Sequence, residues 1–115
     1  MNLEAWETLR SRAQMIVECT IAELPPEVQA EAKKVPCLLQ RVCDEDPDVL
    51  GTYGNFDSGG VSPANGPIIL YLLTIEEYCD DLDEDFDEEV RLTYLHELGH
   101  HLGWDEGDLE ERGLE

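Results

Sequence analysis

The residues best suited to chemistry lie in one short stretch, where His96, Glu97 and His100 form a His-Glu-x-x-His pattern. In a helix, residues four apart project from the same side, so the two imidazoles can bind one metal ion together. Two nitrogen ligands suit zinc. Glu97 lies about 100° around the helix axis from His96. We therefore expect Glu97 to be a general base that acts on a water molecule at the open side of the metal.

A site with two histidines needs a further protein ligand, and several acids follow the pattern. We predict Glu106, six positions after His100, as the third ligand, with water completing the site. Asp105 is the neighbouring alternative, Asp108 is a more distant one, and a site without a third protein ligand stays open. Glu106 could instead belong to the first turn of a short final helix.

The helix that must carry the pattern is predicted from Phe86 to Leu102. Asp85 and Glu88 form a capping-box pattern at its start, and Gly103 suits its end. Apolar side chains cover a broad arc around the axis, which predicts a largely buried helix. The remaining polar stripe consists of Thr93, His96, Glu97 and His100.

The run from Leu95 to Glu106 resembles the minimal zincin-like metallopeptidases of bacteria, which are small proteins with an HExxHxxGxx(D/E) signature. Residues 50–54, 68–71 and 105–114 are similar to further segments of that family, in the same order. The resemblance spans nearly the whole chain. It implies a zinc-dependent peptidase with a zincin-like α+β fold, built as a single domain of residues 1–115.

Two features of longer zinc peptidases are missing from the sequence. Both methionines precede the histidines, so no Met-turn follows the site. No Tyr or His after Glu106 could stabilise an oxyanion, and Tyr53, Tyr71 or Tyr94 could do so only if the fold brought one of them near. The alternative is therefore a catalytically weak or inactive module that binds a peptide or protein. A purely structural zinc site is a third possibility, but the sequence offers no obvious fourth ligand.

The composition restricts the partners of the chain. Its 28 acids against seven bases give a formal charge of −21, which excludes nucleic acids and anionic membranes as expected partners. No apolar run approaches the roughly 20 residues that cross a membrane, and the first residues do not resemble a signal peptide. We expect a cytoplasmic protein whose partner is a peptide or protein substrate. The cysteines are expected to be reduced and buried: Cys19, Cys37, Cys43 and Cys79.

The rest of the chain predicts the elements that support the helix of the histidines. An amphipathic covering helix is expected from Leu3 to Leu24, followed by a short helix from Glu27 to Lys34. The segment from Val35 to Cys43 is predicted to be a strand, and because it is apolar on both faces we expect it at the centre of a small sheet.

Two further strands are predicted, from Leu50 to Phe56 and from Ile68 to Leu73. Residues 57–67 are rich in turn formers and are expected to form an irregular loop or a long hairpin connection. Residues 75–79 are expected to form a helical turn. This order of elements predicts a compact α+β domain with about three strands. The resemblance implies that an edge strand borders the cleft, where a substrate peptide can add as a further strand.

Overall fold

The first half of the chain begins with two helices. The computed structural model describes residues 2–44, 46–53, 55–57, 60–62 and 67–101. Helix α1 spans Leu3–Ala22, and the Asn2 side chain caps it by accepting a hydrogen bond from the Ala5 backbone N–H at 2.8 Å. Helix α2 spans Pro26–Ala32, with its proline in the first turn. Both helices were predicted, with ends within about two residues of those observed.

A three-stranded sheet has the order β1-β5-β2. The strands span Cys37–Gln40 (β1), Gly51–Tyr53 (β2) and Ile68–Tyr71 (β5). Strand β5 is central, parallel to β1 and antiparallel to β2. The prediction that the first strand is central was wrong: β1 lies at an edge and leaves Leu38 43% exposed. Its apolar residues on both faces misled the prediction, because strand order depends on pairing with distant segments.

Helix α3, Leu72–Leu82, starts directly after β5. The predicted strand to Leu73 was therefore too long, and the predicted helical turn at residues 75–79 is part of a longer helix. A continuous apolar run fits a buried strand and a buried helix equally well. The Leu73 N–H donates to the Arg41 carbonyl at 3.0 Å, which ties the first turn of α3 to the segment after β1.

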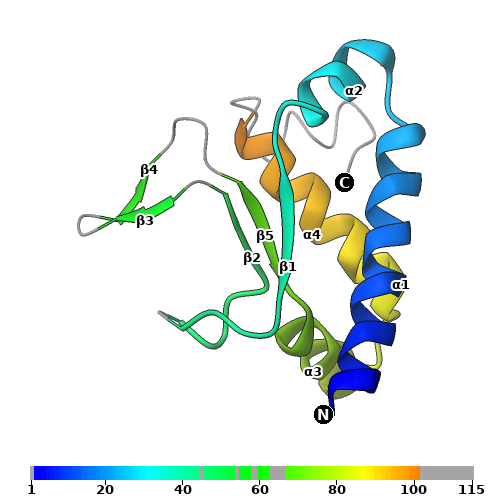
Figure 1. Cartoon of the computed structure of the whole chain (residues 1–115), viewed down its shortest axis with the longest axis vertical. Helices are drawn as coiled ribbons and strands as arrows, with labels where there is room; N and C mark the ends of the chain where they lie inside the picture. The colour runs from blue at the N-terminus through cyan, green and yellow to red at the C-terminus, as the bar shows by residue number, and fades with distance from the viewer. Residues whose placement is uncertain (1, 45, 54, 58–59, 63–66, 102–115) are drawn as a thin grey trace.

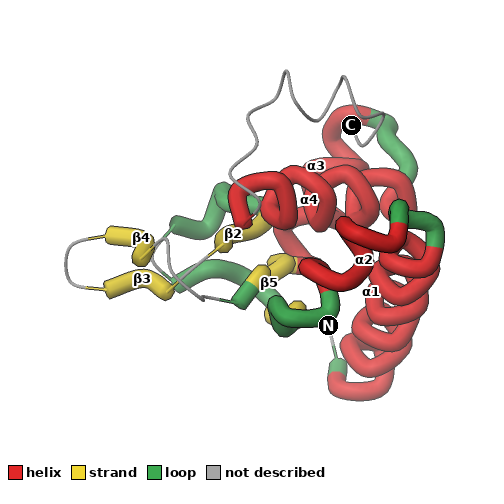
Figure 2. The backbone as a smooth tube through the Cα atoms, turned by 90° about the horizontal axis from the view of Figure 1, so that it is seen from above, coloured by secondary structure: helices red, strands yellow, loops and turns green. Residues whose placement is uncertain are grey.

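A separate two-stranded hairpin follows β2. Strands β3, Asn55–Asp57, and β4, Gly60–Ser62, pair in antiparallel fashion. The hairpin projects away from the helices and the larger sheet (Figures 1 and 2). The prediction of an irregular loop at residues 57–67 was wrong for Asp57 and residues 60–62, which are paired, and the alternative of a hairpin fits them. The predicted strand from Leu50 to Phe56 is divided between β2 and β3.

Helix α4, Phe86–His101, lies between the sheet and α1 (Figure 1). It was predicted to reach Leu102, which lies outside the described residues, as does Gly103. Across the interface with α1, the Arg12 guanidinium pairs with the Asp87 carboxylate at 2.6 Å and lies 5.3 Å from the centre of the Phe86 ring. No helix in the described part of the chain is long and apolar enough to cross a membrane.

The interior is apolar, and α4 supplies much of it. Its side chains pack with those of α1, α3 and β5 around one core; the members that are less than 2% exposed include Ala13, Ile68, Leu70, Leu72, Ile75, Val90, Tyr94 and Leu98. This confirms the predicted apolar arc of α4. Burial on this scale stabilises the fold at about 25 cal/mol per Å² of apolar surface.

None of the four cysteines, all of which the structure describes, forms a disulfide. Cys43 and Cys79 are buried and Cys37 is partly buried, and burial raises the pKa of Cys37 to about 12. Cys19 corrects the prediction of buried cysteines, because it is exposed. It lies two residues after Val17, and two residues turn a helix by about 200°, which carries Cys19 to the opposite side of α1.

Candidate metal centre

The start of α4 fixes the position of the helix on which the histidines lie. The Asp85 carboxylate accepts a hydrogen bond from the Glu88 backbone N–H at 3.1 Å, as the capping prediction requires. The Glu88 carboxylate pairs with Arg91 at 3.0 Å instead of completing the capping box. Acids in the first turn also suit the positive end of the helix dipole.

His96 and His100 lie one turn apart on α4 and approach each other closely. Their Nε2 atoms are 3.2 Å apart, their ring centres are 4.8 Å apart, and the rings are nearly perpendicular at 88°. His96 is partly buried and His100 is exposed. Two imidazole nitrogens are thus directed to one point that solvent can reach.

This spacing fits a tetrahedral metal ion. At a zinc–nitrogen distance of about 2.0–2.1 Å, two nitrogens separated by 3.2 Å subtend roughly 100–105° at the ion. That angle is near the tetrahedral value of about 109°, so little rearrangement is needed for both histidines to bind. Imidazole nitrogens also match the ligand preference of zinc.

Glu97 lies beside the histidines but is buried, with 8% of its surface exposed. Its Oε1 atom is 4.0 Å from Nε2 of His100, and the ligand atoms of the three residues lie within 4.8 Å of one another. Burial raises the pKa of the Glu97 carboxyl, although His100 and His96 act in the opposite direction. A carboxylate with a raised pKa accepts a proton more readily near neutral pH.

Strand β2 passes close to α4 one turn before Glu97. A Cβ atom added to Gly51 would lie 2.8 Å from Cγ2 of Thr93 and 3.2 Å from the Ile69 carbonyl oxygen. Only a residue without a side chain allows this approach. The sequence reasoning missed the contact, although a glycine inside a strand pattern is the signal that could have indicated it.

The other predicted ligands cannot be placed. Glu106, Asp105 and Asp108 lie outside the described residues, so the third ligand stays a prediction. Within the described ranges, His96, Glu97 and His100 form the one cluster of three potential metal-binding side chains.

Two of the three tyrosines considered as oxyanion donors, Tyr71 and Tyr94, are buried and cannot reach a substrate. Tyr94 is 0% exposed, and Tyr71 is buried with its hydroxyl 3.4 Å from Oγ1 of Thr52. The side chain of Tyr53 lies outside the described part of the structure. The hydroxyls of Tyr71 and Tyr94 thus do not complete the site.

Comparison with known proteins bears on the site as a whole. A family model described as zincin-like metallopeptidase matches residues 17–114, which include the last turns of α1, the three-stranded sheet and all of α4. A comparison with curated proteins found no significant match. The family model covers well over half of the chain and includes the histidine cluster. The chain therefore belongs to the zincin-like metallopeptidase family.

Proposed function

We propose that the protein is a zinc-dependent peptidase in which Glu97 is the general base. The observation that carries the proposal is the cluster on α4: two histidine nitrogens 3.2 Å apart beside a buried carboxylate. Membership of a metallopeptidase family supports the same class of reaction. The arrangement offers two nitrogen ligands and one base, which is what hydrolysis by metal-activated water needs.

His96 and His100 hold the ion in this proposal, and Glu106 completes the protein ligands, with Asp105 as the alternative. Bound zinc supplies a Lewis acid that polarises the substrate carbonyl and lowers the pKa of a coordinated water. The Oε1 atom of Glu97 is 4.0 Å from Nε2 of His100, farther than the separation between the two histidine nitrogens. This longer separation supports the role of base rather than ligand.

Glu97 moves the proton in the proposed reaction. It takes a proton from the attacking water as the new C–O bond forms at the peptide carbonyl, and it gives that proton to the leaving amine as the C–N bond breaks. Its burial supports this role, because burial keeps the protonated form accessible.

The substrate is proposed to be a peptide that binds along β2. This strand is at an edge of the three-stranded sheet, and Gly51 brings its backbone against α4 beside Thr93. A peptide that adds to an edge strand is held by main-chain hydrogen bonds, so we expect little selectivity for side chains.

The metal site is tested by elemental analysis of protein purified without a metal-affinity tag. Zinc near one equivalent is expected in wild type, with loss in His100→Ala and in Glu106→Ala. The Asp105→Ala variant is the matched control, since it removes a neighbouring acid. Retention of zinc in Glu106→Ala together with loss in Asp105→Ala would assign the third ligand to Asp105. Wild type that takes up no zinc even when supplied with it would refute the site.

The role of Glu97 is tested with Glu97→Gln on a mixed peptide library analysed by mass spectrometry. Zinc content is expected to stay at the wild-type level while cleavage falls by at least about 100-fold, the usual size of a general-base contribution. Glu77→Gln, on the exposed surface of α3, is the control for a simple loss of charge. Cleavage that survives Glu97→Gln would refute the role of base.

One observation favours a second candidate, a module that binds a peptide without cutting it. Tyr71 and Tyr94 are buried and present no hydroxyl to a carbonyl above the site. For this candidate, wild type loaded with zinc would bind library peptides and release them intact, and Glu97→Gln would bind the same peptides with unchanged affinity.

A further inference from the structure

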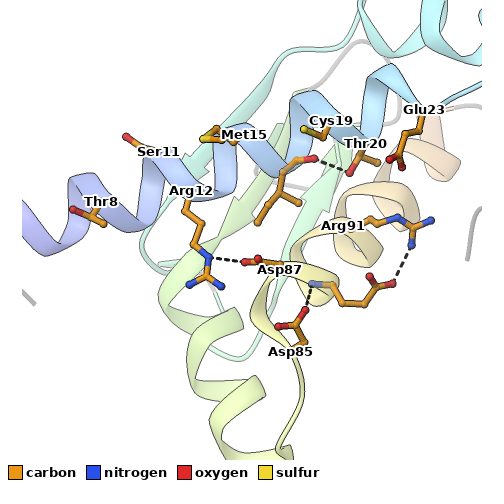
Figure 3. Close-up of a pocket in the computed structure, with 12 residues that line it drawn as sticks. Thr8, Ser11, Arg12, Met15, Cys19, Thr20, Glu23, Asp85, Asp87 and Arg91 are labelled. Carbon is orange, nitrogen blue, oxygen red and sulfur yellow. Dashed lines mark hydrogen bonds and ion pairs between the residues drawn. The ribbon is translucent and has the colours of Figure 1, made fainter.

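A groove runs between α1 and the start of α4 (Figure 3), and neither His96 nor His100 lines it. It has a volume of about 580 Å³. The lining residues of α1 and its C-cap run from Thr8 to Glu23 along one side of the helix. Fifteen residue steps correspond to about 22 Å of helix. The groove is therefore long enough for about four turns of a second helix.

The floor of the groove is apolar and accessible. Met15 is 64% exposed, Ile16 is partly buried and Cys19 is exposed. All three line the groove together with Thr20. Methionine adapts its shape to different partners, which makes it common at surfaces that bind helices. An exposed apolar strip with polar edges is typical of an interaction site.

The edges of the groove carry net negative charge. Four acids line it, Glu23, Asp85, Asp87 and Glu88, against the two cations Arg12 and Arg91, which leaves two negative charges in excess. Both arginines are already engaged, Arg12 with Asp87 at 2.6 Å and Arg91 with Glu88 at 3.0 Å. Figure 3 shows the arginine of α1 reaching across to Asp87.

We propose that this groove binds an amphipathic helix of a partner protein, with apolar side chains on the floor and Lys or Arg side chains at the acidic edges. Charge complementarity decides the kind of partner. A second copy of this chain would bring another −21 charges to an acidic groove. A basic helix is instead attracted to the acidic edges of the groove, and its apolar face covers Met15 and Ile16.

The groove and the metal centre lie on different parts of α4. Arg91 is the lining residue nearest to the histidines, and it precedes His96 by five residues, or about 7.5 Å along the helix and about 140° around its axis. A helix bound in the groove therefore leaves the histidines accessible, and its binding does not depend on whether the site is catalytic. The proposal thus stands apart from the proposed function.

The probe is a designed 18-residue peptide with Leu at helical spacing on one face and Lys on the other. Two control peptides accompany it: one with the same residues in an order that has no apolar face, and one with Glu in place of Lys. Fluorescence anisotropy at about 150 mM salt measures binding to the full chain supplied with zinc. Mass spectrometry checks that the peptide stays intact. We expect a Kd of about 1–50 µM for the Leu/Lys peptide and at least about tenfold weaker binding of both controls.

Met15→Asp separates groove binding from general attraction between opposite charges. The change removes an apolar contact but adds negative charge, so it weakens binding by about tenfold if the peptide sits in the groove. Gln14→Asp is the matched control, because Gln14 is exposed on α1 and does not line the groove. It adds the same charge and should leave the affinity within about twofold. Met15→Ser provides the same test if circular dichroism shows that Met15→Asp is unfolded.

Cys19 is a built-in reporter of occupancy. It is the one exposed cysteine, and it lines the groove. The bound Leu/Lys peptide should slow alkylation of Cys19 at least about fivefold in wild type and far less in Met15→Asp. The proposal is overturned if the control peptide without an apolar face binds equally well, if the Asp variants at positions 14 and 15 bind alike, or if Cys19 is not protected.

Discussion

Tyr94 carries a polar hydroxyl group within the apolar core. Its side chain is fully buried, and its hydroxyl has no hydrogen-bond partner among the described residues. Burial also raises the pKa of the hydroxyl far above its ordinary value. An unpaired hydroxyl costs about 1–3 kcal/mol of desolvation that no bond offsets. We predict that Tyr94→Phe keeps or raises the free energy of unfolding, by up to about 1 kcal/mol, in urea titrations.

The same variant tests whether Tyr94 has a role in hydrolysis. Because the hydroxyl is not accessible, peptide cleavage by Tyr94→Phe should equal that of wild type. Tyr94→Leu is the contrasting variant, since it removes the ring and should destabilise the protein by about 2–4 kcal/mol. A drop in cleavage in Tyr94→Phe at unchanged stability would mean that the hydroxyl reaches the site after all.

Glu89 gives a prediction for the pH dependence of stability. Burial raises the pKa of its carboxyl, and Glu84 and Glu88 add repulsion. The pKa of Glu89 is higher in the folded state than in the unfolded state. Its contribution to the free energy of unfolding is therefore fully present below about pH 4 and is lost as pH rises through the folded-state pKa. In Glu89→Gln, the side chain at position 89 is uncharged at every pH. We therefore predict a higher Tm than wild type at pH 7 and an equal Tm near pH 3.

Glu77→Gln is the control for Glu89→Gln, because it removes one negative charge from an exposed position on another helix. Its Tm should change less at pH 7. If the Tm at pH 7 rose equally in both variants, the rise would come from the lower overall charge and not from the surroundings of Glu89.

The spacing of three residues in the sequence was sufficient to predict that their side chains lie together in the candidate site. Helix geometry alone predicted that His96 and His100 would meet with Glu97 beside them. The third ligand depends on how the chain returns after α4, which no local period determines. The tyrosines show the same limit, since only packing decides that the Tyr94 hydroxyl is directed into the core.

At the level of the elements, the contact between β2 and α4 depends on Gly51. A methyl group there meets Cγ2 of Thr93 at 2.8 Å and the Ile69 carbonyl oxygen at 3.2 Å. The strand would have to move away from the helix that carries the histidines. We predict that Gly51→Ala lowers the free energy of unfolding by about 1–3 kcal/mol and also reduces the affinity for zinc, as measured by competition with a chelator.

A double-mutant cycle identifies the cause. Thr93→Ser removes the methyl group that the new Cβ meets, so part of the lost stability should return when Gly51→Ala and Thr93→Ser are combined. The loss of unfolding free energy in the double variant is then smaller than the sum of the losses in the two single variants. Strict additivity would place the cost of Gly51→Ala in the strand backbone and not in the contact with Thr93.

Helices were predicted better than strands for a physical reason. Both ends of α1 and the start of α4 follow from caps, prolines and a 3.6-residue period that lie in or beside the elements themselves. The position of β1 at an edge depends on β5, about 30 residues later. The early end of β5 at Tyr71 is similar, because the apolar Leu72 and Leu73 continue the pattern without a break.

The charge of the whole molecule predicts how salt affects its stability. The 28 acids repel one another across the surface, whereas the few described ion pairs are mainly exposed and weak. Raising NaCl from about 20 to 300 mM screens distant charges. We predict that the Tm rises, as measured by calorimetry. In a variant that combines Asp80→Asn, Asp81→Asn and Glu84→Gln, the rise should be smaller, and an unchanged rise would point to hydration effects of the salt.

The pairing of α1 with α4 also has a consequence for synthesis on the ribosome. Arg12 and Asp87, which join the two helices, are 75 residues apart in the chain. At a synthesis rate of about 5–20 residues per second, roughly 4–15 s separate the two residues. For that time the apolar side of α1, with Trp6 and Val17, lacks the helix α4 that packs against it in the folded protein. The newly made N-terminal helix is thus a natural target for chaperones until α4 has been made.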